Sequence, residues 1–524
     1  MKRKVLLLAA FVISIGGIYA QGEMDAYKLS QSDLSGTARS VGMGGAMGAL
    51  GGDISAVSIN PAGIGVFKSY EVVTTLNFQN TNTKTELNAG KLDQSKFKVT
   101  FDNLAFVTVF PTNSDVAPSI NFGFSYNRLK NFDRKYSMKG SNLNKPISEY
   151  MAYRANGIDP RGLLFEDDSD IKPLQNYDWL AVLGYNSWMI DELDEPGKYG
   201  YLGSIRDNAT NNYLSVREKG SISTYDFNVG TTFADVVSAG LTLSITDISY
   251  RLSSDYDEDY NGISNANMTL MNDLETDGTG YQFSLGLIFK PIDALRIGLA
   301  YHSPTWYDMT DYASAGLRYD LRGLIPNLEG NNATIETGVF RYDYRLRTPD
   351  RYTLSLAAIL LDKGEGLFPK VSLSADYEYT NYKNNMKLFE DNGDRMNHDP
   401  NVDIKEDFKG ASTVRVGAEV RFTNQFSMRA GYSWKQSPLN KEFKNNEREV
   451  MTVGSVPHFT LDGDTHYYTY GLGYRFSPYV YADVAFVMRN QKADLYSFDH
   501  SEKATWKDNT FQGLLTLGFK FRTL

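Results

Sequence analysis

Residues 280–302 read GYQFSLGLIFKPIDALRIGLAYH, and their alternation decides the fold. In the first half, apolar residues occupy every second position from Tyr281 to Phe289, with mostly polar or small residues between them. The second half repeats this pattern from Leu295 to Tyr301. Alternation of this length indicates a β-strand with two different faces. Because only the short link KPIDA separates the two runs, we predict neighbouring antiparallel strands.

The same alternation recurs along the whole chain and predicts about fourteen strands. They lie near residues 69–78, 97–110, 117–131, 222–233, 239–252, 279–290, 295–307, 342–360, 369–382, 412–423, 425–437, 466–477, 479–490 and 509–521. Links after even-numbered strands are short, and links after odd-numbered strands are long. Short turns on one side, long loops on the other and aromatic strand ends are typical of an outer-membrane β-barrel. We therefore predict an all-β, antiparallel transmembrane barrel.

The predicted long loops are polar and acidic. They cover residues 79–96, 132–221, 253–278, 308–341, 383–411, 438–465 and 491–508. The largest, 132–221, is too long for a connection without structure of its own. Helix-like apolar spacing in PLQNYDWLAVLGY and SWMIDEL predicts that it folds as a lid over the barrel mouth.

The amino terminus predicts export to the bacterial outer membrane. Lys2, Arg3 and Lys4 precede a short apolar run, and IYA precedes Gln21, so residues 1–20 read as a signal peptide cleaved after Ala20. Residues 21–68 then precede the first strand, and residues 69–524 contain all the predicted strands. No later segment approaches eighteen consecutive apolar residues, so we expect no transmembrane helix.

The sequence lacks the residue types and spacings that would indicate an enzyme or a metal site. The chain has no cysteine, and its five histidines are scattered. The net charge of −10 argues against nucleic acid as a partner. The acidic run at 255–259 has calcium-like spacing, but Tyr260 stands where such a loop needs glycine; a solvated loop is the simpler interpretation. We predict no enzyme, no cofactor and no metal site.

The inward positions of the strands carry an unusual number of cations. Candidate contacts for a ligand or a plug are Arg296, Arg415, Arg421, Arg429 and Arg475. Two interpretations stay open: packing and ion pairs around a plug, or contact with the acidic head of a ligand.

The glycine-rich run Ser40–Gly65 misses the spacing of a nucleotide-binding loop. SGTARSVGMGGAMGALGGDISAVSINPAGIGVF instead resembles the amino-terminal hatch of the FadL/TodX family of outer-membrane transporters for long-chain fatty acids and other hydrophobic compounds. KPIDALRIGLAYHSP, RTPDRYTLSLA, RAGYSWKQSP and YGLGYRFSP resemble barrel phrases of that family. On this resemblance, residues 21–68 are a small plug, and its gating candidates are Gly44, Gly45, Gly48, Asn60, Pro61, Ala62 and Gly63.

The resemblance implies passive transport of a hydrophobic molecule, with exit sideways through a break in the wall. The family has a kinked third strand at that break, and Gly123 is the candidate in the matching strand here. Expected partners are a hydrophobic ligand and outer-membrane lipids, and the large surface loops could bind other outer-membrane proteins. Two alternatives remain: a non-transporting scaffold in a secretion or assembly complex, and a diffusion porin, against which the hatch argues.

Overall fold

The strands form a closed antiparallel barrel in the computed structural model, which describes residues 22–165, 173–193, 198–205, 210–360, 369–390, 399–440, 443, 450 and 452–521. The barrel closes because β21 (Ala504–Phe521) pairs with β1 (Tyr70–Leu87). The predicted all-β fold with fourteen barrel strands is thereby confirmed. The proposed signal peptide lies outside the described residues. No helix among those described is long and apolar enough to cross a membrane.

Some positions in the wall are built from two consecutive strands. These are β3 (Ser119–Asn131) with β4 (Arg134–Leu143), β10 (Leu295–His302) with β11 (Trp306–Asp320), and β13 (Phe340–Arg347) with β14 (Arg351–Leu360). The other wall strands are β2 (Gly90–Pro111), β7 (Thr210–Phe233), β8 (Val237–Tyr260), β9 (Asn267–Ile292), β15 (Lys370–Thr380), β17 (Ala411–Arg421), β18 (Phe426–Lys435), β19 (Phe459–Arg475) and β20 (Val480–Tyr496). β12 (Asn332–Glu336) and β16 (Lys387–Glu390) extend the edges of β11 and β13.

Several strands are longer than predicted. Segments 79–96, 253–278 and 491–508 are largely strand, so the prediction of long loops there is wrong. The sequence pattern does not show these strand extensions, because both faces of the wall are polar beyond the membrane. In β1, for example, Thr81, Thr83 and Thr85 face inward and are buried, whereas Asn82 and Lys84 face outward. A polar–polar alternation gives no amphipathic signal.

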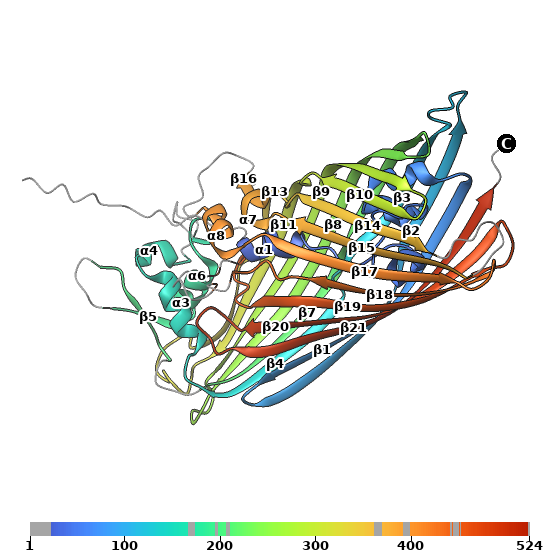
Figure 1. The fold of residues 1–524 in the computed structure, drawn as a ribbon. Coiled ribbons are helices and arrows are strands. Elements are labelled where there is room, and N and C mark those ends of the chain that lie inside the picture. The colour runs from blue at the N-terminus through green and yellow to red at the C-terminus, as the bar shows by residue number, and fades with distance from the viewer. Residues whose placement is uncertain are drawn as a thin grey trace, which may run out of the picture.

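Segment 132–221 carries most of the helical structure outside the lumen. After β4 come α3 (Ile147–Ala155), α4 (Pro160–Leu163), α5 (Pro173–Asn176) and α6 (Trp179–Asn186), followed by the hairpin of β5 (Ile190–Glu192) and β6 (Tyr201–Gly203). Figure 1 shows them at the end of the barrel away from the C-terminus, near α7 (Tyr382–Asn385) and α8 (Pro400–Asp407). The helix predicted in PLQNYDWLAVLGY is present, but SWMIDEL contains strand β5 instead of a helix.

Outward side chains mark the membrane-facing band. Leucine and phenylalanine dominate its middle, and exposed aromatic residues lie toward both ends. The girdle toward the long loops includes Tyr225, Tyr281, Trp306, Tyr352 and Tyr468, and the girdle toward the short turns includes Phe233, Phe289, Phe422, Tyr474 and Phe519. Two such girdles are the expected anchors at the two membrane interfaces.

Candidate functional site

The segment before β1 lies inside the barrel. It contains α1 (Glu23–Leu29), α2 (Ala38–Gly42) and the 3-10 helices η1 (Ile54–Ser58) and η2 (Pro61–Val66). We call residues 22–68 the plug. Its backbone is bonded directly to the inner wall: the Ala38 amide donates to Thr516 Oγ1 at 2.7 Å, and the Met47 and Gly48 amides donate to Asp376 Oδ2 at 3.1 and 3.0 Å. The plug therefore closes the lumen by specific contacts with several strands.

The glycine run allows the plug backbone to touch the wall backbone. Gly44 has φ +65°, and a Cβ added to it would lie 2.8 Å from the Tyr432 backbone nitrogen. A Cβ on Gly48 would lie 2.2 Å from Ser355 Oγ. The wall also has inward-facing glycines at these contacts. A Cβ added to any of them would approach plug atoms: Gly240, Gly286, Gly298, Gly417, Gly431 and Gly471. Glycine on both sides is thus what permits this close approach.

The Asn60–Pro61–Ala62 turn joins two parts of the plug to β9. Asn60 Oδ1 accepts from the Ala62 amide at 3.1 Å and so caps η2, which begins at Pro61. Asn60 Nδ2 donates to the Gly48 carbonyl at 2.7 Å and to the Leu287 carbonyl at 3.1 Å. One buried side chain therefore holds the glycine run, the turn and the wall together. Gly63 lies against Gly51, on the other side of the same turn.

At the short-turn end, the Glu419 carboxylate of β17 is the common partner of three arginines. Glu419 accepts from Arg39 Nε at 3.0 Å, from Arg429 Nε at 2.7 Å and from Arg421 Nε at 3.1 Å. Burial opposes the charge of Arg39, but Glu419 and Asp53 raise the pKa of its guanidinium above the usual value. Because Arg39 belongs to the plug, this group is an ionic link between plug and wall.

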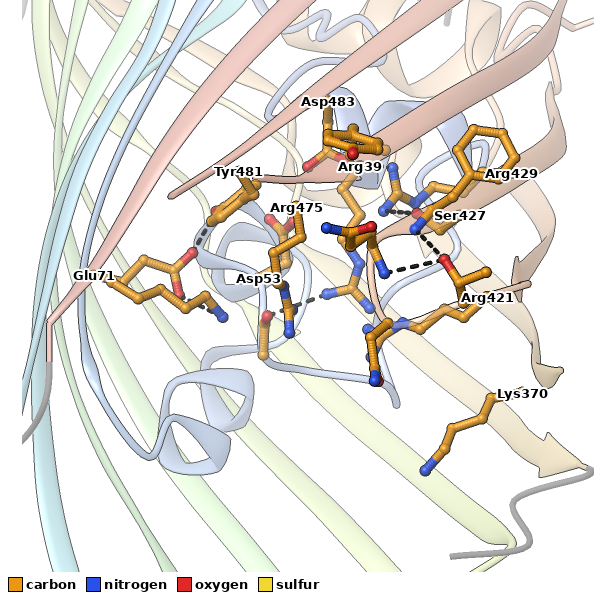
Figure 2. A pocket seen from close by; sticks show the side chains of 18 residues that line it. Arg39, Asp53, Glu71, Lys370, Arg421, Ser427, Arg429, Arg475, Tyr481 and Asp483 are labelled. Carbon is orange, nitrogen blue, oxygen red and sulfur yellow. Dashed lines mark hydrogen bonds and ion pairs between the residues drawn. The ribbon is translucent and has the colours of Figure 1, made fainter. Parts of the chain in front are cut away.

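The same residues border a cavity of about 560 Å³ at the short-turn end. Figure 2 shows Arg39, Arg429 and Asp483 on one side of it and Glu71 with Tyr481 on the other. Arg475 also lines this cavity, and among the described residues it has no ion pair. The lining is strongly charged, so this cavity suits water or an anion better than an apolar molecule.

The remaining predicted arginines lie elsewhere around the plug. Arg296 Nη1 donates to the Leu50 carbonyl of the plug at 2.6 Å. Arg415 pairs with Glu378 at 3.2 Å and lines a second cavity, of about 150 Å³, in the middle of the lumen. The structure therefore distributes the five arginines over three places and does not bring them into one site.

The mid-lumen cavity has an amphipathic lining. Leu29, Leu34 and Ile59 of the plug contribute apolar surface. Arg351, Arg415 and Lys435 contribute positive charge, against the carboxylates of Glu378 and Asp33. Three cations thus face two carboxylates, which leaves the lining with a net positive charge.

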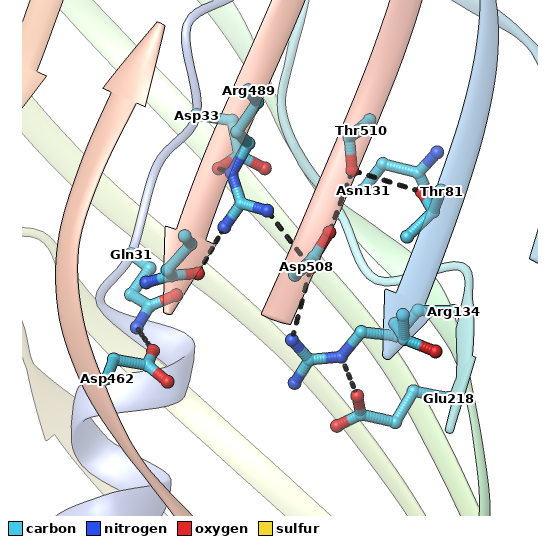
Figure 3. Close-up of polar contacts among 12 residues, drawn as sticks. Gln31, Asp33, Thr81, Asn131, Arg134, Glu218, Asp462, Arg489, Asp508 and Thr510 are labelled. Carbon is cyan, nitrogen blue, oxygen red and sulfur yellow. Dashed lines mark hydrogen bonds and ion pairs between the residues drawn. The ribbon is translucent and has the colours of Figure 1, made fainter. Parts of the chain in front are cut away.

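Further ion pairs connect the plug to the wall above this cavity (Figure 3). Asp33 lies 3.8 Å from both Lys130 Nζ and Arg489 Nε, and Gln31 Nε2 donates to Asp462 Oδ2 at 3.2 Å. Burial alone would raise the pKa of Asp33, but Lys130 and Arg489 lower it below its usual value. Arg489 in turn pairs with Asp508 at 3.0 Å.

Beyond these pairs, toward the lid, much of the lumen is filled by packed apolar side chains. Met24 and Tyr27 of α1 are buried in a large cluster of aromatic and aliphatic side chains that extends into the lid. A small cavity of about 40 Å³ lies against α1, and its lining mixes apolar residues such as Phe132 and Leu252 with charged ones such as Arg134 and Glu218. The outer end of the lumen is therefore largely filled by packed side chains, and the two larger cavities lie further in.

The wall is incomplete between β2 and β3. Their pairing runs from Pro111↔Ser119 to Asn103↔Asn127 and stops there. Residues 90–102 of β2 pair with β1, whereas β4 pairs with β7. Side chains bridge this split, among them Asp102 and Arg128 at 3.6 Å. The outward residues of β2 beside it are exposed and apolar (Phe97, Val99 and Phe101), so the split faces the membrane.

Gly123 lies below this split, in a part of β3 that is paired on both sides. Its partners are Val107 of β2 and Asn228 of β7. A Cβ added to Gly123 would lie 2.7 Å from Ile64 Cδ1 of the plug. The irregularities of register occur instead beside Asp102 and Leu129.

Some of these features were missed in the sequence. The wall glycines lie at inward positions of strands whose apolar–polar alternation was visible in the sequence. That these glycines all contact the plug could not be read from the sequence. Arg39 and Lys435 gave no motif, because their partners are hundreds of residues away in the chain, and Arg351 gave none because its partner Glu378 lies on another strand.

Comparison with known proteins shows similarity to a family of outer-membrane proteins. A family model described as "Outer membrane protein transport protein (OMPP1/FadL/TodX)" matches residues 214–513, more than half of the chain. Outer membrane protein P1 of Haemophilus influenzae is 26% identical over 210 residues, which are 40% of this chain and 37% of that relative.

Two solved structures share the fold at low sequence identity. A Pseudomonas aeruginosa FadL homologue has a TM-score of 0.53 at 14% identity, covering 94% of this chain and 99% of that one. The P. putida toluene transporter TodX has a TM-score of 0.51 at 13% identity, covering 94% and 100%.

Proposed function

The chain belongs to the outer membrane protein transport protein family (OMPP1/FadL/TodX), and we propose that it carries amphiphilic hydrophobic molecules such as long-chain fatty acids. Its family consists of outer-membrane channels for hydrophobic compounds and not of enzymes. The protein is thus an outer-membrane transport channel.

The choice of an amphiphilic ligand rests on the lining of the mid-lumen cavity. An apolar tail gains about 25 cal/mol per Å² when it leaves water, and Leu29, Leu34 and Ile59 of the same cavity offer it apolar surface. The net positive lining formed by Arg351, Arg415 and Lys435 would hold a carboxylate head. A purely apolar molecule would have no use for these charges. Arg415 is the residue of the sequence-based set that supports a ligand role.

We propose that the ligand leaves sideways at the split between β2 and β3. The split borders apolar outward residues, so a tail entering it would reach lipid without crossing water. Asp102 and Arg128 would have to separate for the path to open. Gly123 would act below the split, where the wall meets Ile64 of the plug.

The test is a binding measurement on the purified barrel with two probes, oleate and toluene. Lys435→Gln and Arg351→Gln should each weaken oleate binding about tenfold, since each removes a charged hydrogen-bond donor, and should leave toluene binding unchanged. Lys405→Gln, an exposed lysine on α8, is the matched control. Equal loss of both probes would mean that the variants damage the plug and would contradict the headgroup assignment.

The scaffold alternative is separated by a second measurement on gently purified protein. Lipids are extracted and identified by mass spectrometry, beside affinity capture of protein partners from the same membranes. Transport predicts bound amphiphile; a stoichiometric protein partner without any bound amphiphile would contradict it.

A further inference from the structure

The outer face of β20, β21 and β1 carries two rows of identical polar residues. Asn490 of β20 pairs with Asn509 of β21, which pairs with Asn82 of β1. Two residues further toward the long loops, Lys492 pairs with Lys507, which pairs with Lys84. These strands lie side by side in Figure 1. Three amides and three ammonium groups therefore occupy adjacent positions of the wall.

Both rows point outward, at the edge of the membrane-facing band. Their inward neighbours Thr83, Gln491 and Asp508 are buried, whereas Lys84, Lys492 and Lys507 are exposed. Next to the asparagine row, on the side of the short turns, Met488 and Phe511 are exposed and apolar. Two residues of a strand span roughly 7 Å, so the lysine row lies about one headgroup layer beyond the apolar band.

The protein itself offers these side chains few partners. Like charges directly opposite each other destabilise a sheet, and Lys492, Lys507 and Lys84 form two such contacts. Lys84 has an exposed ion pair with Asp93 at 3.6 Å. Among the described residues, Lys492 and Lys507 have no ion pair, and the side chains of the three asparagines have no hydrogen bond.

We propose that the two rows bind the phosphorylated headgroup of a glycolipid in the outer leaflet. The lysines would donate to phosphate oxygens, and the asparagine amides would pair with the sugar hydroxyl and amide groups beneath them. The opposite wall is unsuited to phosphate, because Asp247, Asp277 and Asp308 face outward on β8, β9 and β11. The bound glycolipid would therefore occupy one side of the barrel.

The experiment is native mass spectrometry of the detergent-solubilised full-length protein titrated with purified lipopolysaccharide. The triple variant Lys84→Gln, Lys492→Gln and Lys507→Gln should bind it at least about tenfold more weakly, since each lysine near an anionic surface contributes. The matched control Lys219→Gln, Lys383→Gln and Lys405→Gln changes three exposed lysines away from the row and should bind as the wild type does. Equal binding by the triple variant would overturn the proposal, provided that both variants show the heat-modifiable migration of a folded barrel.

Three further arms identify the ligand chemistry. Dephosphorylated lipopolysaccharide should bind as weakly to the wild type as the intact lipid does to the lysine variant. Inorganic phosphate at equal concentration should not displace the lipid; displacement would assign the rows to a free anion and overturn the proposal. Changing the three asparagines to alanine should abolish the preference for lipopolysaccharide over phosphatidylglycerol, and an unchanged preference would overturn the role of the asparagine row.

Discussion

Arg39 of the plug and Glu419 of β17 are joined by two hydrogen bonds, from Nε to Oε2 at 3.0 Å and from Nη2 to Oε1 at 3.3 Å. Glu419 is 2% exposed and also accepts from Arg429 and Arg421. The carboxylate is therefore the common partner of three cations, and only one of them belongs to the plug. Loss of Glu419 and loss of Arg39 should therefore have unequal effects on the docking of the plug.

We predict that Glu419→Gln loosens the plug more than Arg39→Gln does. Removing Glu419 leaves the three arginines without their shared anion, at a cost of roughly 3–5 kcal/mol for breaking a buried pair. Removing Arg39 leaves Glu419 with two other cations. The rate of proteolysis within residues 22–68 of the folded barrel measures the effect. Equal rates in the two variants would contradict the shared-partner arrangement.

Sequence predicted the barrel well because a membrane wall repeats a simple rule, apolar outside and polar inside, on every strand. It failed in two kinds of place. At Thr81–Glu86 both faces are polar, so the strand was hidden. At the site, the plug is held to the wall by pairs such as Arg39 with Glu419 and the Ser32 carbonyl with Lys435, which no local pattern connects. The Asn60–Pro61 turn was visible because it is local in the sequence, whereas the bond from Asn60 to the Leu287 carbonyl was not predictable.

Gly44 and Gly52 should respond differently to alanine. Both have positive φ, +65° and +66°, so each variant costs about 1 kcal/mol in backbone conformation. At Gly44 the new Cβ would also meet the backbone of Tyr432 at 2.8 Å, whereas at Gly52 nothing lies within 4 Å. Gly44→Ala should therefore unseat the plug and Gly52→Ala should not. Calorimetric melting of the two variants checks this, and a larger loss for Gly52→Ala would refute the steric explanation.

Asn60 should tolerate aspartate poorly and alanine worse. Aspartate keeps the oxygen that caps η2, but it loses the donor to the Gly48 and Leu287 carbonyls. Alanine loses both functions and leaves buried carbonyl groups unpaired, a penalty of about 1–3 kcal/mol. Melting temperatures should rank wild type, Asn60→Asp and Asn60→Ala in descending order. The reverse order of the two variants would mean that the buried negative charge outweighs the cap.

Asp33 should make plug docking sensitive to acid. Its pKa is lowered from 3.8 by Lys130 and Arg489, although burial acts in the opposite direction. The folded state therefore binds fewer protons than the unfolded state, and the stability from this group is present above pH 3.8 and lost as the pH falls through the lower folded value. Asp33→Asn should melt at a lower temperature than the wild type at pH 7, and the difference should shrink as the pH falls below 3.8. A constant difference across this range would exclude Asp33 as the titrating group.

Gly123→Leu should lower uptake of a fatty acid without lowering the yield of folded barrel. The leucine side chain would enter the space of Ile64 Cδ1, 2.7 Å from its Cβ, and would press the plug away from the wall below the split. Strand pairing with Val107 and Asn228 does not involve the side chain, so the barrel should still assemble. Gly513→Leu is the matched control, because its Cβ faces outward with the nearest atom at 3.9 Å. Uptake of labelled oleate by cells, normalised to heat-modifiable barrel, measures both variants. If Gly123→Leu transports as well as Gly513→Leu, the contact between plug and wall at β3 does not govern the exit.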